Sequence, residues 1–123
     1  MPNTLKLDSE RREAPRYEVR DVHAELANEA FNASTILVDL SLNGALLEGD
    51  EPLKRDPGEA VSLRVLLEDE RSFEASARIV HCTDCRIGLE FLAFDPVDFE
   101  ILSELIAQLR RSRVASLLAN PRG

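Results

Sequence analysis

The sequence has few of the residues on which catalysis, metal binding and disulfide frameworks depend: two cysteines, two histidines and no tryptophan. It also lacks any run of about 18 apolar residues, the length that suggests a membrane-spanning helix. The first residues contain no apolar segment of the kind that a secretory signal requires. These absences predict a cytoplasmic protein without membrane insertion, in which the cysteines stay reduced.

The cysteines, Cys82 and Cys85, lie in the stretch HCTDC, a spacing that zinc sites and redox motifs share. A structural zinc ion usually takes four ligands, and only His81 and His23 are present to supplement the cysteines. His23 alternates onto a polar strand face, and no βαβ pattern accompanies the pair. We therefore expect no metal and no cofactor, and we assign the cysteines no function. Because no histidine is placed as a base for a serine nucleophile, we also expect no hydrolytic serine site.

Positive charge is scarce as well, because 15 lysines and arginines stand against 23 aspartates and glutamates, giving a net charge of −8. A general nucleic-acid-binding protein normally presents a basic surface. Proteins that bind single strands also stack bases on aromatic side chains, and this chain has five phenylalanines and one tyrosine. A small barrel that binds nucleic acid is therefore a disfavoured alternative, although a few arginines are enough to bind a small anion.

Apolar and polar side chains alternate through residues 16–94, which is typical of half-buried strands. The alternation is clearest in three stretches, VSLRVLLED (61–69), SFEASARIV (72–80) and RIGLEF (86–91). Asn43-Gly44 predicts a tight turn at which a positive φ is tolerated, and Asp56-Pro57-Gly58 predicts a second turn. Short strands joined by such turns predict an all-β fold with a C-terminal helix, built on a six-stranded antiparallel β-barrel.

The pattern changes at Asp95, where helical spacing replaces the alternation. Asp95 is a good N-cap and Pro96 fits the first helical position. Apolar residues then recur three and four positions apart, at Ile101, Leu102, Leu105, Ile106 and Leu109. We expect three parts: a flexible N-terminal arm (1–15), the barrel (16–94) and an amphipathic helix (95–119) that covers an open end or seam of the barrel.

Two short motifs are candidates for a binding site. ERREAPRYEVR (10–20) contains four arginines, and taken alone it is typical of a solvated charge run. Arg12 and Arg16 are nevertheless spaced so that they can bind phosphate oxygens or stack on a purine. DLSLNG (39–44) places a carboxylate and a hydroxyl on one strand face beside a glycine, which taken alone is typical of a strand end with a side-chain turn.

Together the motifs read R-x-x-x-R followed by D-x-S-x-x-G, and this combination resembles the PilZ domain family of bacterial cyclic di-GMP receptors. The residues at the defining positions are Arg12, Arg16, Asp39, Ser41 and Gly44. RIGLEF resembles the closing strand of that family, with Gly88 at its usual glycine. The resemblance extends over residues 9–112, nearly the whole chain.

The resemblance implies a cyclic di-GMP site made by both motifs. Arg12 and Arg16 would bind phosphates and guanine edges, where N7 and O6 accept hydrogen bonds from a guanidinium. Asp39 and Ser41 would hold the guanine and its supporting arginine from the barrel, and Gly44 would leave room. The arm would be mobile when empty and fold over the ligand, so that part of the binding free energy offsets its ordering.

Arg11 and His81 modify this expectation. Family members with an extra arginine directly before the first motif tend to bind an intercalated pair of ligand molecules, so Arg11 implies two ligands per protomer. His81 stands where some members have a tryptophan that stacks on guanine. Its parity with Ala77 and Ile79 instead favours an inward, structural histidine, which we take as the preferred of these two interpretations.

The resemblance further implies a receptor or adaptor, and not an enzyme, that changes conformation on binding this second messenger and signals to an unidentified partner protein. A PilZ-like adaptor that binds protein without nucleotide is the main alternative. We expect a monomer or weak dimer. Arg20 lies outside both motifs, and we interpret it as an ordinary cation on a strand surface.

Overall fold

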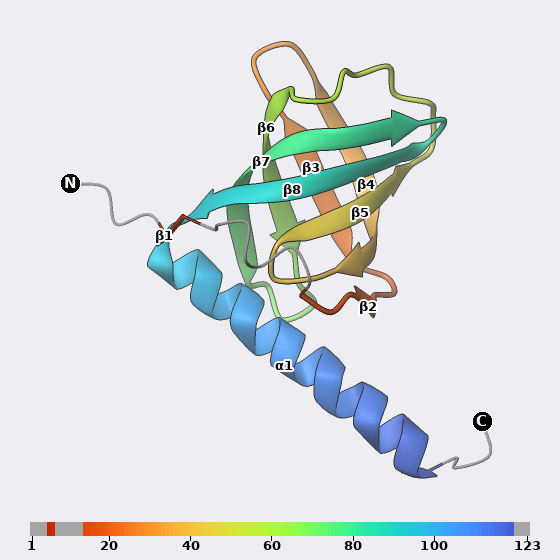
Figure 1. The fold of residues 1–123 in the computed structure, drawn as a ribbon, viewed down its shortest axis with the longest axis vertical. Coiled ribbons are helices and arrows are strands. Elements are labelled where there is room, and N and C mark those ends of the chain that lie inside the picture. The colour runs from red at the N-terminus through yellow and green to blue at the C-terminus, as the bar shows by residue number, and fades with distance from the viewer. Residues whose placement is uncertain (1–4, 7–13, 120–123) are drawn as a thin grey trace.

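A computed structural model describes residues 5–6 and 14–119, with side chains described from 14 to 113. Six antiparallel strands form a closed barrel: β3 (His23–Ala27), β4 (Asn32–Leu40), β5 (Gly44–Gly49), β6 (Ala60–Leu66), β7 (Ser72–Thr83) and β8 (Arg86–Phe94). Their order is β8-β5-β4-β3-β6-β7, and pairing of β7 with β8 closes the barrel (Figure 1). The predicted six-stranded antiparallel barrel is confirmed.

Two further strands of two residues each extend the sheet. β1 (Leu5–Lys6) pairs with the end of β8, and β2 (Tyr17–Glu18) pairs with the end of β4. Part of the predicted N-terminal arm therefore lies against the barrel at β1. Arg11 and Arg12, which carry the rest of the arm's predicted role, lie outside the described residues.

The alternation of apolar and polar residues in the sequence matches the alternation of inward-facing and outward-facing side chains in the barrel wall. In β6, Val61, Leu63 and Val65 point inward and are buried, whereas Ser62 and Arg64 are exposed. Burying one face of each strand removes apolar surface from water at about 25 cal/mol per Å². The largest fully buried side chains are Phe73, Phe91, Phe94, Leu26, Leu37, Leu40, Leu47, Leu63, Ile79, Ile87, Leu89 and Leu102.

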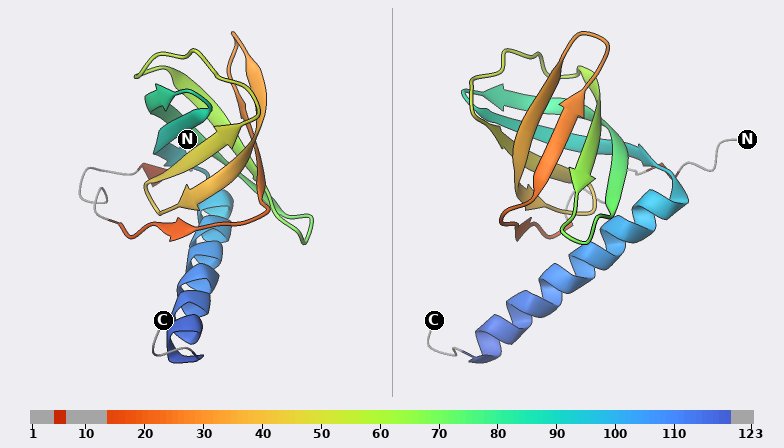
Figure 2. Two further views of the ribbon diagram at one scale, coloured as in Figure 1. Left: turned by 90° about the vertical axis from the view of Figure 1, so that its right-hand side faces the viewer. Right: turned by 180° about the vertical axis from the view of Figure 1, so that it is seen from behind.

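Helix α1 (Pro96–Ala119) crosses one end of the barrel. Its first turn is closed by the Phe99 N–H, which donates to the Asp95 carbonyl oxygen at 2.9 Å. Leu102 is fully buried, and the Phe99 ring packs edge-on against Phe94 with centroids 5.6 Å apart. The first half of α1 thus covers the barrel end, while its second half extends past the barrel (Figures 1 and 2). Among the described elements, no helix is both long and apolar enough to cross a bilayer.

Both turns predicted from the sequence are present in the fold. Gly58 has a φ of 91°, as the predicted Asp56-Pro57-Gly58 turn requires. The tight reversal predicted at Asn43-Gly44 is present between β4 and β5, although neither residue is among the described positions with positive φ. Residues 41–43 make the reversal, and Gly44 begins β5.

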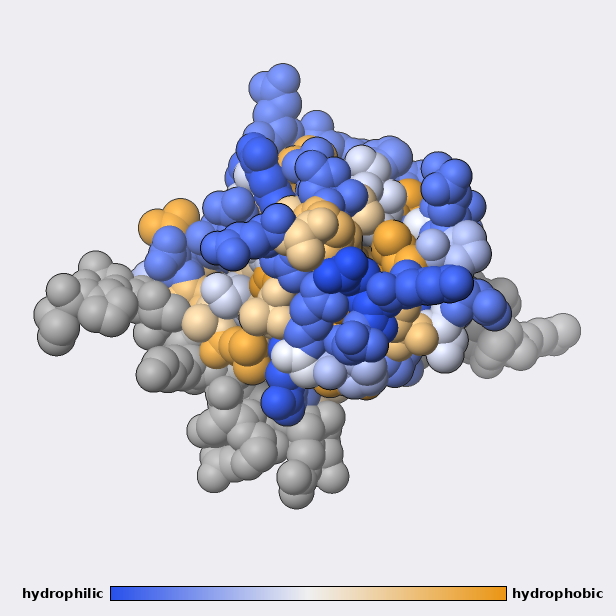
Figure 3. Space-filling model, turned by 90° about the horizontal axis from the view of Figure 1, so that it is seen from above, coloured by the Kyte–Doolittle hydropathy of each residue, from blue (hydrophilic) through white to orange (hydrophobic). Residues whose placement is uncertain are grey.

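The barrel end opposite the helix is largely hydrophilic, with small separate apolar patches (Figure 3).

Candidate functional site

The two sequence motifs meet through Arg16 and Asp39. Arg16 directly precedes β2, whose pairing with β4 sets Glu18 opposite Asp39. The Arg16 Nη1 donates to Asp39 Oδ1 at 2.6 Å, and the Arg16 side chain is 51% exposed. An ion pair this open adds little stability. A guanidinium carries five N–H donors, so further N–H groups of Arg16 remain available to an anion.

His81 lies beside this pair because β7 has a bulge. The register runs from Ile79 opposite Leu89 to His81 opposite Gly88, so one residue, Val80, is extra. Val80 and His81 are consequently both exposed. The expectation that His81 points inward by parity with Ile79 is therefore wrong, since a bulge shifts the alternation by one residue.

Because Gly88 has no side chain, the His81 ring can lie close to the sheet. A Cβ built on Gly88 would come within 2.2 Å of His81 Nε2, so any other residue would displace the ring. The imidazole therefore lies flat on the barrel surface over a bare stretch of backbone. Its exposed face is open to an aromatic ring of a ligand.

A hollow of about 290 Å³ joins these residues on the outer barrel surface. It is lined by Arg16, Asp39, Ala45, Leu46, Val80, His81 and Gly88. This volume is near the lower limit for small-molecule sites, which are typically about 300–1,000 Å³. The hollow combines a cation–carboxylate pair, an imidazole and an apolar floor, which is a suitable combination for a flat ring bearing an anionic group.

Three lining residues, Ala45, Leu46 and Val80, were missed by the sequence analysis. Leu46 lies opposite Asp39 on one side and Gly88 on the other, at the centre of the site. Its outward position follows from the alternation in GALLEG, which is a signal that the sequence offers. Val80 lines the hollow only because of the bulge in β7, and no pattern of residues in the sequence predicts that bulge.

Ser41 has a different environment from Asp39. β4 ends at Leu40, so the strand alternation does not continue and the two side chains do not share a face. Ser41 is fully buried, its Oγ accepts the N–H groups of Asn43 and Gly44 at 3.2 Å each, and it donates to Asn43 Oδ1 at 2.6 Å. The hydroxyl thus orders the turn that links β4 to β5.

Gly44 is required where β5 approaches β8. A Cβ there would come within 2.3 Å of the Leu89 carbonyl oxygen, and 3.7 Å from Arg16 Nη2. The glycine therefore permits close packing of backbone and leaves space beside the Arg16 guanidinium. Of the eight predicted site residues, Arg16, Asp39, His81 and Gly88 line the hollow, and Ser41 and Gly44 form the adjoining turn.

The predicted positions Arg11 and Arg12 lie outside the described residues. Cys82 and Cys85 are free thiols and half-buried, and the Cys82 thiol donates to the Leu53 carbonyl oxygen at 2.7 Å. Within the described part of the chain, no group of three histidine, cysteine or acidic side chains is arranged to hold a metal ion.

The most strongly shifted carboxyl belongs to another part of the barrel. Hydrogen bonds from the Arg55 guanidinium, and then from the Asn28 amide at 2.8 Å, lower the pKa of Glu59 to about 2. The Arg55 guanidinium also lies over the Phe31 ring, 4.3 Å from its centroid. This cluster ties the segment before β6 to the β3–β4 connection, and it has a structural role.

The architecture is that of a small closed barrel with a C-terminal helix and a hollow on its outer wall. The chain belongs to the PilZ domain family, because the family model described as "PilZ domain" matches residues 10–108. The comparison with curated proteins finds no significant match.

Solved structures share the fold. The PilZ domain of CeSA from a cellulose-synthesizing bacterium is 20% identical with a TM-score of 0.65, covering 79% of this chain and 99% of that one. YcgR from Escherichia coli in complex with c-di-GMP is 18% identical with a TM-score of 0.70, covering 86% and 49%. The Bacillus subtilis inhibitor of motility MotI/DgrA is 18% identical with a TM-score of 0.67, covering 89% and 53%. At these identities the similarity is one of fold.

Proposed function

We propose that this protein is a receptor for cyclic di-GMP, the hollow around Arg16 and Asp39 being its binding site. The observation that carries the proposal is that residues 16, 39, 81 and 88, from three separate parts of the sequence, line one hollow. Family membership supports it, as do the structures of similar fold that hold c-di-GMP, YcgR and its PilZ domain.

Each lining group has a chemical task. The Arg16 guanidinium donates to the N7 and O6 of a guanine or to phosphate oxygens. Asp39 holds Arg16 in place through the 2.6 Å hydrogen bond. The His81 ring stacks on the guanine face above Gly88, and Leu46 supplies the apolar floor. Ser41 and Gly44 act through the turn that positions Asp39 and leaves room for Arg16.

Arg11 and Arg12 complete the site in this proposal. Arg12 adds a second guanidinium to the phosphates, and Arg11 provides the additional cation that two stacked ligand molecules require. Two molecules of cyclic di-GMP carry four phosphate charges between them, and their mutual repulsion must be offset by nearby arginines. The arm then closes over the ligand pair, which changes the charge and shape of this barrel face.

The protein signals by presenting that altered face to a partner protein and performs no chemistry itself. A ligand changes the partner's affinity only through a difference between the bound and the free face. The alternative is a PilZ-like adaptor that does not bind nucleotide. It would have the same fold, but it gives no ligand for the exposed guanidinium of Arg16. The nucleic-acid alternative is disfavoured by the charge of −8.

Calorimetric titration with cyclic di-GMP tests the proposal. Arg16→Ala is expected to weaken binding about tenfold to a hundredfold, the usual contribution of one hydrogen-bonded charge. The matched control is Arg86→Ala, since Arg86 is 54% exposed and bonded to Glu48 at 3.0 Å but lies outside the hollow. Equal affinity of wild type and Arg16→Ala would show that the site is elsewhere. Absence of binding to the wild type would favour the protein-only adaptor.

A further inference from the structure

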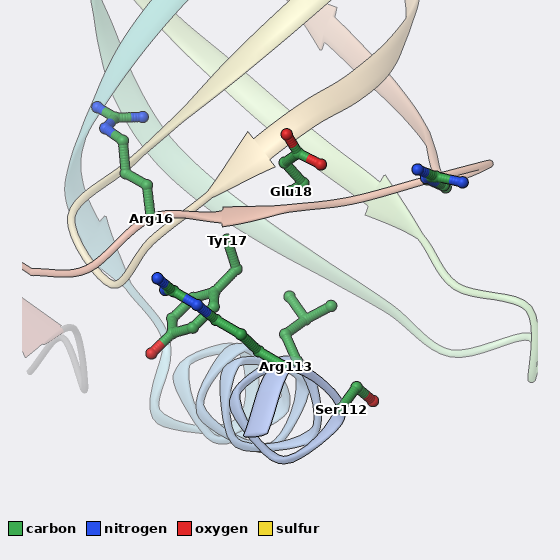
Figure 4. Close-up of a pocket in the computed structure, with 7 residues that line it drawn as sticks. Arg16, Tyr17, Glu18, Ser112 and Arg113 are labelled. Carbon is green, nitrogen blue, oxygen red and sulfur yellow. The ribbon is translucent and has the colours of Figure 1, made fainter. Parts of the chain in front are cut away.

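A second and larger cavity lies between β2 and the projecting half of α1. Its volume is about 710 Å³, and Figure 4 shows the side chains that surround it. The lining residues are Arg16, Tyr17, Glu18, Arg20, Leu109, Ser112 and Arg113. The cavity lies beside the hollow around Arg16 and Asp39, the proposed nucleotide site, which is called the nucleotide hollow below. Arg16 is the one residue common to both linings.

The cavity is basic in an acidic protein. Arg20 and Arg113 are both exposed, and within the described part of the chain no carboxylate lies within ion-pair distance of either. Glu18 is the one acidic side chain among the lining residues, and Arg16 is already bonded to Asp39. Two guanidinium groups are therefore available to an anionic ligand at the cavity.

The wall between these arginines is apolar. The Tyr17 side chain is 7% exposed and lies against the helix, with the Arg113 guanidinium 5.7 Å from its ring centroid (Figure 4). Leu109 lies one helical turn before Arg113 and is half-buried. A ligand that fits must offer an apolar group to the half-buried Leu109, beside the buried Tyr17 ring, and negative charges to the arginines around them.

We infer that this cavity binds a short acidic peptide segment of a partner protein, with one apolar side chain packed on Leu109 beside Tyr17. Such a segment feels the local field of Arg20 and Arg113, because charges more than about 8 Å away are screened at physiological salt. A long polyanion, such as a nucleic acid or an anionic membrane, would instead be repelled by a molecule of net charge −8. The charge and the apolar wall together favour a peptide.

The shared Arg16 couples this cavity to the nucleotide hollow, and this part of the inference rests on the proposed function. When the phosphates of cyclic di-GMP occupy the guanidinium of Arg16, that group contributes less positive charge to the neighbouring cavity. The acidic segment therefore binds more weakly when nucleotide is present. By linkage the nucleotide also binds more weakly when the segment is present, by the same factor.

Fluorescence anisotropy with a labelled peptide of four glutamates around one phenylalanine tests the inference, first without nucleotide. Arg20→Ala and Arg113→Ala are each expected to weaken binding about threefold to fivefold, in the range of partly exposed ion pairs. Arg111→Ala is the matched control, since it removes the same charge from the same helix but lies outside the cavity lining. The glutamine version of the peptide is expected to bind at least tenfold more weakly.

The inference is overturned if the glutamate peptide does not bind, if Arg111→Ala weakens it as much as Arg113→Ala does, or if the glutamine peptide binds equally well. Tighter binding of a single-stranded DNA oligonucleotide of equal charge also overturns it. The coupling is then read from the wild type with saturating cyclic di-GMP, where the peptide affinity is expected to fall. An unchanged affinity in protein that binds nucleotide refutes the coupling, whereas a failure of nucleotide to bind refutes the proposed function alone.

Discussion

The His81 imidazole covers Gly88 so closely that a Cβ on Gly88 would come within 2.2 Å of its Nε2. The two residues come from neighbouring strands and meet directly opposite each other, after the bulge in β7. This contact places an aromatic ring on the wall of the barrel, in the lining of the hollow that also contains Arg16 and Asp39.

Gly88→Ala is expected to reduce cyclic di-GMP affinity with little loss of stability. The new methyl group must displace the His81 ring, and an exposed side chain moves at a cost of about 1 kcal/mol or less. Calorimetry measures the affinity and thermal unfolding measures the stability. In a His81→Ala background the same change is expected to cost no further affinity, because the ring is already absent. An additional loss there would show that Gly88 acts in some other way.

Gly44→Ala is expected to destabilise the fold by about 1–3 kcal/mol, as overpacking does. The added Cβ would meet the backbone carbonyl oxygen of Leu89 at 2.3 Å, and backbone in a paired strand cannot move aside. Gly49→Ala is the control, because the nearest atom to its new Cβ would be 3.5 Å away. Chemical denaturation of both variants measures the difference, and equal stability would contradict the close approach of β5 and β8.

Glu59 is expected to make the folded state sensitive to acid. Its folded pKa of about 2 lies below its ordinary value of 4.5, because Arg55 and Asn28 donate to the carboxylate. Its contribution is therefore complete above pH 4.5 and is lost as the pH falls toward 2. Glu59→Gln is expected to be less stable at pH 7 and to lose less stability between pH 5 and pH 3.

The control for this acid effect is Glu25→Gln on β3, which removes a carboxylate that makes no ion pair within the described residues. Denaturant midpoints measured across the pH range compare the two variants. An identical pH dependence in Glu59→Gln and the wild type would contradict the role of the Arg55–Glu59 cluster.

Arg11→Leu is expected to change the ligand count from two molecules of cyclic di-GMP per protomer to one. Without the extra cation, the second ligand's phosphates are no longer offset, while Arg12 and Arg16 still bind the first molecule. The stoichiometry from calorimetric titration measures this directly. A ratio of one to one in both proteins would refute the two-ligand proposal and leave the single site intact.

Features of the fold that depend on neighbouring residues, such as strand alternation and helix starts, could be predicted from the sequence. Alternation in stretches such as VSLRVLLED predicted the inward residues of β6, and Asp95-Pro96 predicted the start of α1, because both depend on neighbouring residues. The pairing of Arg16 with Asp39 was anticipated only through the family resemblance. Residues 23 positions apart meet through the register of β2 and β4, which local patterns do not encode.

The errors have a common cause in strand irregularity. The β7 bulge turned His81 outward and brought Val80 to the hollow, although simple alternation placed His81 inside. The end of β4 at Leu40 separated Ser41 from the face of Asp39. The arginine-lined cavity was missed because Arg20 and Arg113 are far apart in the sequence, and only the packing of α1 beside β2 unites them.

A ¹H–¹⁵N NMR titration of the isotope-labelled protein with cyclic di-GMP tests directly whether the hollow around Arg16 and Asp39 is the nucleotide site. We expect the largest shift changes at the amides of Leu46, His81 and Gly88 and at the Arg16 side chain, with little change at Asn28 and Glu59. Shift changes confined to the Asn28–Glu59 end of the barrel, or no change at saturating ligand, would contradict the assignment of this hollow as the cyclic di-GMP site.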